Sequence, residues 1–368
     1  MSMNATISRL KQGGGVIDRY REFLPVFNST PIVSLGEGNT PLVYSANLSA
    51  RVGRGCEVFV KNEGVNPTGS FKDRGMTVAV SKAIERGARM LICASTGNTS
   101  ASAAAYAARA GIECAVILPA GKIASGKLLQ AFVHGAKIIA IDGNFDDALR
   151  IVRKLGQREN FVIVNSINPD RIAGQKTAVF EIVDLLSDAP DFHLLPLGNA
   201  GNLTAYWAGY RQYQGHGRAK RLPAMLGLQA AGAAPIFHDK IIEQPETIAS
   251  AIRIGNPASW RQAREAIDRS KGIVDLVTDE QIIEAQIWLA QHEGMFVEPA
   301  SAAAIAGLFK CCNAKDAAYS FQKIPEGSRI ACTVTGHGLK DPDALTGRMG
   351  KITPVAAKEE QVLRALGL

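Results

Sequence analysis

The chain has 368 residues, and 46% of them are hydrophobic, which is enough for a sizeable core in two domains or one bilobed domain. The formal net charge is +7, but the lysines and arginines are scattered singly, which argues against nucleic-acid binding and favours small anionic partners. No stretch reaches the roughly 18 apolar residues of a membrane span, and residues 1–15 lack the apolar core of a signal peptide. The six cysteines show no CxxC spacing, so we expect reduced thiols in a cytoplasmic protein without membrane contact.

Short apolar runs alternate with alanine-rich helical stretches along most of the chain. The expected strands are residues 56–61, 90–94, 114–118, 137–141, 161–164 and 192–197. This βαβ rhythm predicts an α/β fold of two lobes, each a mostly parallel twisted sheet flanked by helices. Binding groups in such folds lie in loops beyond the carboxyl ends of the strands. The candidate loops are therefore residues 62–74, 95–100, 165–175, 198–202 and 335–340.

The first candidate loop contains the run Pro-Thr-Gly-Ser-Phe-Lys-Asp-Arg at residues 67–74, which places Lys72 between a strand-like and a helix-like segment. Burial there, or a cationic neighbour such as Arg74, would lower the pKa of Lys72 enough for Schiff-base chemistry. Ser70 would cap the helix or bind an anion. The alternative is that Lys72 is an ordinary solvated lysine in a first helical turn.

The second loop is rich in hydroxyl and amide side chains, and an alanine-rich helix follows it. Its polar members are Ser95, Thr96, Asn98, Thr99 and Ser100. Free N–H groups and the helix dipole make such a junction attractive to a carboxylate or a phosphate. Simple N-capping is the alternative, although a cap needs only one such residue.

The fourth loop is rich in glycine and opens a helix expected to start at Leu203. It consists of Gly198, Asn199, Ala200, Gly201 and Asn202. It is neither a P-loop nor a dinucleotide fingerprint, because both the Gly-Lys-Ser/Thr and the G-x-G-x-x-G patterns are absent. A backbone nest for a phosphate and a tight strand-to-helix turn are both consistent with it.

The last loop follows a strand-like run and contributes a hydroxyl, Thr335, and His337 between two glycines. His337 is more consistent with a turn residue than with an acid or base. Upstream, Thr278 to Gln281 resembles a capping box, and Pro299 opens an alanine-rich helix. No His, Cys, Asp and Glu cluster has metal-ligand spacing and no G-x-S-x-G occurs, so we expect neither a metal site nor a serine hydrolase.

Together these loops resemble a pyridoxal-phosphate site, and the chain resembles the threonine synthases of the tryptophan-synthase-β-like (fold type II) family. The matching segments are residues 36–42, 66–75, 94–110, 198–207, 296–303 and 333–342. The version Asn-Pro-Thr-Gly-Ser-Phe-Lys-Asp-Arg-Gly at residues 66–75 is specific to that group. One departure is His337, where similar sequences commonly have Asn.

The resemblance implies pyridoxal 5'-phosphate as cofactor, with Lys72 as the Schiff-base and proton-transfer residue and Asn98 at the phenolic oxygen. Residues 198–202 would bind the cofactor phosphate, and Thr335 would face the pyridine nitrogen. The substrate carboxylate would be bound by Ser95, Thr96 and Thr99. The substrate phosphate would be bound by Lys61, Asn165, Ser166 and Arg171, although a solvated loop at residues 165–171 is also consistent with the sequence.

The implied reaction converts O-phospho-L-homoserine and water into L-threonine and phosphate by γ-elimination and β-addition, so the enzyme would be a carbon-oxygen lyase acting on phosphate. A homodimer is a further family expectation. We expect a large cofactor-phosphate-binding domain of residues 1–60 and 161–368, and a smaller substrate-binding domain of residues 61–160. A threonine or serine dehydratase and a non-catalytic binding protein of the same fold are the alternatives.

Overall fold

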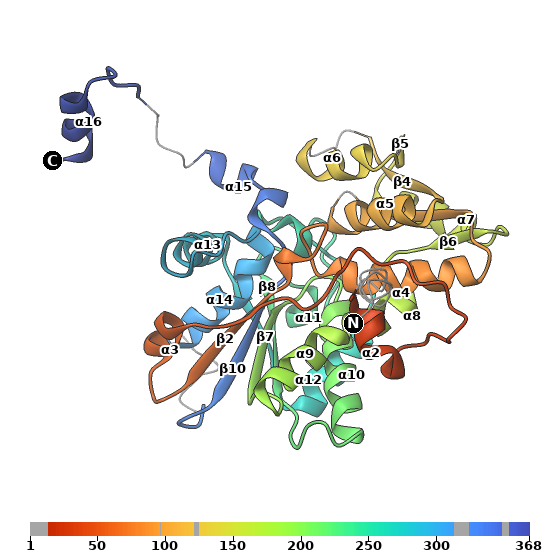
Figure 1. Ribbon diagram of the computed structural model, residues 1–368, viewed down its shortest axis with the longest axis horizontal. Coiled ribbons are helices and arrows are strands. Elements are labelled where there is room, and N and C mark those ends of the chain that lie inside the picture. The colour runs from red at the N-terminus through yellow and green to blue at the C-terminus, as the bar shows by residue number, and fades with distance from the viewer. Residues whose placement is uncertain (1–13, 96, 121–124, 313–323, 348–352) are drawn as a thin grey trace, which may run out of the picture.

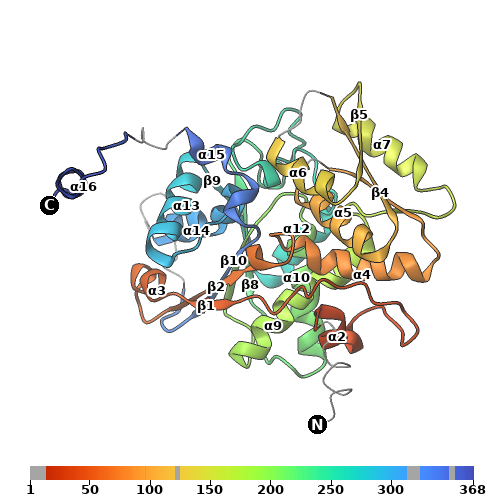
Figure 2. The same cartoon turned by 45° about the horizontal axis from the view of Figure 1, so that its top comes forward.

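The computed structural model describes residues 14–95, 97–120, 125–312, 324–347 and 353–368. Helices surround two separate sheets, one in each of two lobes, as the two views in Figure 1 and Figure 2 show. Strands of both sheets are interleaved along the sequence, because the small sheet is inserted between the second and third strands of the large one. The lobes are thus connected at both ends of the insertion.

The large sheet has six strands in the order β1-β2-β10-β7-β8-β9, and only the β1–β2 pair is antiparallel. Its strands are β1 (Leu42–Tyr44), β2 (Glu57–Asn62), β7 (Phe192–Pro196), β8 (Ala224–Ala230), β9 (Ile273–Val277) and β10 (Arg329–Val334). The small sheet is wholly parallel, with the order β5-β4-β3-β6. Its strands are β3 (Met90–Ala94), β4 (Glu113–Pro119), β5 (Lys137–Ile141) and β6 (Phe161–Ile163).

The helices follow the strands in the expected alternation. In the first half of the chain they are α2 (Val16–Tyr20), α3 (Ala46–Val52), α4 (Lys72–Glu85), α5 (Asn98–Ala110), α6 (Ser125–Val133), α7 (Phe145–Leu155), α8 (Pro169–Gln175) and α9 (Thr177–Leu186). In the second half they are α10 (Gly201–Gly215), α11 (Pro235–His238), α12 (Trp260–Ser270), α13 (Asp279–Glu293), α14 (Pro299–Cys312), α15 (Asp343–Thr346) and α16 (Glu359–Leu366).

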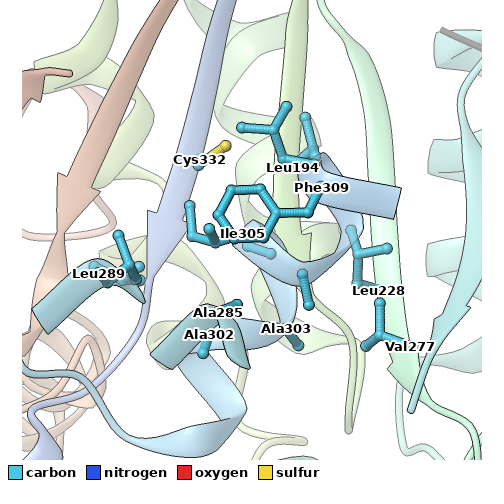
Figure 3. Packing of buried hydrophobic residues seen from close by; sticks show 14 of the residues in the cluster. Leu194, Leu228, Val277, Ala285, Leu289, Ala302, Ala303, Ile305, Phe309 and Cys332 are labelled. Atoms are coloured by element: carbon cyan, nitrogen blue, oxygen red, sulfur yellow. The ribbon is translucent and has the colours of Figure 1, made fainter. Parts of the chain in front are cut away.

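The two faces of the large sheet bury different sets of side chains. Successive strand residues point to opposite faces, so Leu194 packs against α13 and α14 while Leu195 packs against α9, α10 and α12. Figure 3 shows the first of these layers, where Ile305 and Phe309 of α14 lie among residues from the sheet. The small sheet is covered in the same way by α4, α5 and α6 on one face and α7 on the other.

The predicted α/β class is confirmed, and the candidate loops lie at the carboxyl ends of the parallel strands. Two local predictions are wrong. The helix of the glycine-rich loop starts at Gly201 rather than Leu203, and residues 169–175 form helix α8 rather than a loop. Asn168 caps α8 by accepting a hydrogen bond from the N–H of Asp170, and Pro169 suits the first helical position.

The predicted domain boundaries remain predictions, but the first cuts strand β2 and the second separates strand β6 from its sheet. Strand β2 ends at Asn62 in the large sheet, and β6 pairs with β3 in the small sheet although it begins at Phe161.

All six cysteines are free thiols, and five of them are buried. In the described part of the chain, no helix is long and apolar enough to cross a membrane, and no cluster of metal-binding side chains occurs.

Candidate active site

The lysine loop, the Thr335 loop and the starts of two helices are tied together by short contacts. The N–H of Phe71 donates to the carbonyl of Thr335 (3.0 Å), and Ser70 forms a β-bridge with Gly336. The N–H of Glu298, just before α14, donates to the carbonyl of Gly336 (3.0 Å). A Cβ at Gly336 would lie 2.4 Å from a carboxylate oxygen of Glu298, so a side chain at this position would displace that carboxylate. Segments from both lobes therefore meet around Lys72.

Lys72 is the first residue of α4 and is half-buried. Burial, followed by the positive charge of Arg171, lowers the pKa of the Lys72 ammonium to about 7, while the Glu298 carboxylate acts in the opposite direction. An amine with this pKa is partly neutral near neutrality and is therefore a nucleophile and a proton acceptor. The solvated-lysine interpretation does not fit this environment.

The cation that lowers the pKa of Lys72 is Arg171, and the sequence-based suggestion of Arg74 is wrong. Arg74 is fully buried, and its guanidinium forms ion pairs with Glu63 (2.6 Å) and Glu181 (2.7 Å). These two carboxylates raise the pKa of Arg74 well above its usual value, against the effect of burial. Arg74 is thus held by carboxylates on the far side of the first turn of α4.

Lys61 belongs to the same buried group of charges. Its ammonium donates to Glu181 (2.7 Å) and to the carbonyl of Thr40 (2.7 Å), and its side chain is fully buried. Burial lowers the pKa of Lys61, and Glu181 opposes this. Because Lys61 is bound by a carboxylate in this way, its position gives no support to the predicted contact with a substrate phosphate.

Arg171, in contrast, is buried beside Lys72, and some of its guanidinium N–H groups have no acceptor in the described structure. Only one of its nitrogens has a protein partner, since Nη1 donates to the carbonyl of Val164 (2.9 Å), while Nε and Nη2 have none in the described structure. Burial lowers the pKa of Arg171 to about 10, so the guanidinium still carries its charge at neutral pH. Two adjacent N–H groups without a partner in the described structure, on a buried cation, are suited to a bidentate anion.

The other residues predicted at the substrate phosphate lie just before α8. The amide of Asn165 accepts from the N–H of Ala94 (3.1 Å) and donates to its carbonyl (2.9 Å). It therefore links the end of β3 to the Arg171 segment. Ser166 is half-buried and follows it directly.

Helix α5 starts at Asn98, and no side chain caps its N-terminus. Simple capping therefore does not account for the polar residues of this loop. Asn98 Nδ2 donates to both carboxylate oxygens of Glu298 (2.9 and 3.1 Å), while its buried Oδ1 has no partner in the described structure. Ser95 Oγ accepts from the N–H of Gly97 (3.2 Å), and Thr99 is buried in the first turn. Thr96 lies outside the described residues.

The glycine-rich loop offers its backbone N–H groups. Ala200 has φ 64°, which is unusual for a residue with a side chain, and helix α10 begins immediately after it. Among the described residues, none of the N–H groups of residues 198–202 donates a hydrogen bond to the protein. A Cβ at Gly198 would lie 3.0 Å from the Cα of Ile252, so the chain passes too closely for a larger residue. This arrangement is suited to bind a phosphate through the backbone.

Thr335 is buried at the carboxyl end of β10, and its Oγ1 lies 3.0 Å from Oγ of Ser301. His337 caps a short 3-10 helix, Gly338–Lys340, because its Nδ1 accepts from the N–H of Leu339 (3.2 Å). It therefore acts as a turn residue, as the sequence indicated.

Residues 33–336 match the family model described as pyridoxal-phosphate dependent enzyme. The threonine synthase of Mycobacterium leprae (strain TN) is 57% identical over 355 residues, which cover 96% of this chain and 96% of the relative. The chain belongs to the threonine synthase family. Another member, from the archaeon Methanocaldococcus jannaschii, is 52% identical over 335 residues, which cover 89% of this chain and 81% of the relative. The solved structure of maize serine racemase, with 21% identity and a TM-score of 0.70 over 90% of this chain and 93% of that chain, shares the fold.

Pyridoxal phosphate is the cofactor of this family, and the residues present here fit it. A phosphate needs N–H donors, and the loop of residues 198–202 has them free. Several buried polar atoms in the candidate loops have no protein partner, which is costly unless a ligand or water supplies one. Within the described residues they are Ser70 Oγ, Asn98 Oδ1, and Nε and Nη2 of Arg171.

Two residues at this site were not among the predicted site residues. Glu298 interacts with both Asn98 and Lys72, and Ser301 contacts Thr335. The sequence contained one signal for Glu298, namely an acidic residue in the apolar run directly before the helix-opening Pro299. Ser301 resembled any small residue in the first turn of an alanine-rich helix and gave no signal.

Proposed function

We propose that this chain is a threonine synthase that converts O-phospho-L-homoserine and water into L-threonine and phosphate. The observation that carries the proposal is the buried guanidinium of Arg171, which has two unpaired nitrogens beside Lys72. A dehydratase acting on threonine or serine has no substrate phosphate to bind there. The family membership of the chain supports the same activity.

In the proposed site, Lys72 would bind pyridoxal phosphate covalently and Asn98 would be the partner of its phenolic oxygen. The free N–H groups of residues 198–202 bind the cofactor phosphate, and Thr335 faces the pyridine nitrogen. The bound cofactor supplies the electron sink that stabilises negative charge at the substrate α-carbon. A neutral hydroxyl at the ring nitrogen leaves that ring largely unprotonated, which favours elimination and replacement.

The substrate would lie between two anion sites. Its carboxylate would meet the first turn of α5 and would be bound by Ser95, Thr96 and Thr99. Its phosphate would bind Arg171 together with Asn165 and Ser166. Lys61 is left out of this proposed site because it pairs with Glu181.

Lys72 is the proposed carrier of protons. The lowered pKa of its amine, about 7, suits removal of the α proton and then a β proton of the substrate. Loss of the β proton expels phosphate from the γ-carbon. The released phosphate, which takes up its second proton near neutral pH, is a suitable base for the water that adds at the β-carbon.

We further propose a cytoplasmic homodimer, supported by the reduced cysteines and the family relationship.

The reaction itself is tested with purified protein carrying pyridoxal phosphate. Phosphate and threonine should form in equal amounts from O-phospho-L-homoserine. The Lys72→Ala variant should release neither product and should lose the visible absorption of bound cofactor.

Arg171→Gln separates this function from the alternatives. It should lower kcat/KM for O-phospho-L-homoserine by about 100-fold, because a charge-assisted bidentate pair contributes about 1.5–3 kcal/mol. Ammonia release from threonine or serine at a higher kcat/KM than phosphate release would instead favour a dehydratase. A cofactor-loaded protein with no turnover of any of the three substrates would favour a binding protein.

A further inference from the structure

Ser301 is held rigidly beneath the loop that follows β10. It is the third residue of α14 and is fully buried. The same helix packs into the core of the large lobe through Ala302, Ile305 and Phe309, as Figure 3 shows. The hydroxyl of Ser301 therefore occupies a fixed position relative to Thr335.

The hydrogen bonds of Ser301 can be counted. Its Oγ accepts from the N–H of Thr335 (2.9 Å) and from the N–H of Gly336 (2.8 Å). It also lies 3.0 Å from Thr335 Oγ1 and 3.2 Å from the carbonyl of Gly336. A hydroxyl has one donor and two acceptor positions, and the two N–H groups fill both acceptors. Ser301 therefore cannot accept the hydroxyl proton of Thr335.

This count determines whether the Thr335 hydroxyl can donate its proton to Ser301. The single proton of Ser301 can go to the Thr335 oxygen or to the carbonyl of Gly336, and in either case the proton of Thr335 needs another acceptor. Within the described structure, Ser301 is the only hydrogen-bond partner of that hydroxyl. The Thr335 carbonyl is bound by the N–H of Phe71, next to Lys72, so the residue is attached to the lysine loop.

We propose that Ser301 is a positioning residue that makes the Thr335 hydroxyl a hydrogen-bond donor to the pyridine nitrogen of the cofactor. The inference rests on the proposed position of Thr335 at that nitrogen, and it adds the direction of the hydrogen bond. A nitrogen that accepts this bond keeps its lone pair occupied without gaining a proton. Ser301 thus acts on the electronic state of the ring through Thr335.

The test is a double-mutant cycle on cofactor affinity, which needs no turnover. Dissociation constants for pyridoxal phosphate are measured with cofactor-free wild type, Ser301→Ala, Thr335→Val and the double variant. Thr335→Val should weaken binding about fivefold, the effect of one hydrogen bond of about 1 kcal/mol. Ser301→Ala should weaken it by a similar factor when Thr335 is present, and by less than twofold in the Thr335→Val background.

Equal weakening by Ser301→Ala in both backgrounds would mean that Ser301 only anchors the loop and would overturn the proposal. An unchanged affinity in Thr335→Val would overturn it as well, because Thr335 would then not contact the ring. If Ser301→Ala does not fold, Ser301→Cys takes its place, since a thiol is a weaker acceptor of similar shape. A missing phosphate release would disprove the proposed reaction without affecting these affinities, so the two proposals fail separately.

As a second readout, pyridoxal phosphate labelled with nitrogen-15 in the ring reports directly on the pyridine nitrogen. Its chemical shift should move in the same direction in Ser301→Ala and in Thr335→Val, because both variants weaken the same hydrogen bond. A shift that changes only in Thr335→Val would contradict the role of Ser301. Circular dichroism of each variant establishes that it is folded.

Discussion

At the scale of single residues, the site depends on charges that are not neighbours in sequence. The Arg171 guanidinium and the Glu298 carboxylate both act on Lys72 and shift its pKa in opposite directions. Burial and Arg171 prevail, so the amine is partly neutral near pH 7. The environment disfavours the charged ammonium form of Lys72, and the amine is reactive for this reason.

Because its environment disfavours the charged form of Lys72, we predict that the free energy of unfolding depends on pH. Lys72 has a pKa of about 7 when folded and an ordinary value of 10.5, so the unfolded chain binds the extra proton between these values. Stability should therefore rise with pH across this window. Without cofactor, Lys72→Met should be more stable than wild type by about 1–2 kcal/mol at pH 6, allowing for partial exposure. The difference should vanish near pH 10.5.

Urea denaturation at pH 6, 8 and 10 measures this effect. Lys240→Met is the matched control, because Lys240 is exposed and its replacement should change stability little at any of these pH values. A gain for Lys72→Met that stays constant with pH would exclude a titration of Lys72 as its origin.

Glu298 gives a second prediction at the residue scale. Its carboxylate raises the pKa of Lys72, so Glu298→Gln should lower it further, while a glutamine oxygen can still accept from Asn98. The rate at which pyridoxal phosphate attaches to the protein should then reach its half-maximal value at a lower pH than in wild type. Stopped-flow absorbance across pH 5–9 measures this. A midpoint that stays in place or rises would contradict the assigned interaction.

At the scale of elements, the crossing of α4 and α8 brings Arg171 to Lys72. Both helices have glycine at the contact, so the two backbones approach closely. A Cβ at Gly174 would lie 2.0 Å from the carbonyl oxygen of Arg74, and one at Gly75 would lie 2.7 Å from the carbonyl oxygen of Arg171. A side chain at either position would push the helices apart.

Gly174→Ala should therefore destabilise the protein by about 1–3 kcal/mol and weaken turnover by moving Arg171. Gly215→Ala, at the end of α10, is the control because its Cβ would meet no atom within 4 Å. That variant should be neutral or slightly stabilising, since alanine restricts the unfolded chain. Thermal unfolding with a phosphate-release assay measures both effects. Equal behaviour of the two variants would show that the crossing tolerates a methyl group.

At the scale of the whole molecule, four buried charges join β2, α4 and α9 behind the lysine loop. Lys61 and Arg74 share Glu181, and Arg74 also binds Glu63. Burial alone would raise the pKa of Glu181, but the two cations, Arg74 above all, lower it to about 2. The group is balanced in charge and fixes α4 against the large lobe.

Removing one member should leave a buried charge without compensation. Glu181→Gln should destabilise the protein by about 3–5 kcal/mol, whereas Glu113→Gln, which breaks the exposed pair with Lys137, should cost less than about 1 kcal/mol. Urea denaturation at pH 7 compares them. Because Glu181 titrates at about 2 when folded and at 4.5 ordinarily, its contribution is present above pH 4.5 and declines as the pH falls toward 2. A loss equal to that of Glu113→Gln would contradict this stabilising role.

The sequence by itself determined the α/β alternation, the candidate loops at the carboxyl ends of the strands and the position of Lys72. These follow from local patterns, because apolar periodicity and turn residues act over a few positions. The capping box at Thr278 and the helix opened by Pro299 were predicted for the same reason and are confirmed.

Only the tertiary structure decided which charges face each other. Lys61 and Arg171 looked equivalent in sequence, yet one pairs with Glu181 and the other keeps two nitrogens unpaired. Glu298, just before α14, and Ser301, in its first turn, lie more than 200 residues after Lys72, and they reach the site because α14 packs on the large sheet. Such pairings depend on long-range contacts between elements, and local sequence patterns do not encode which elements will meet.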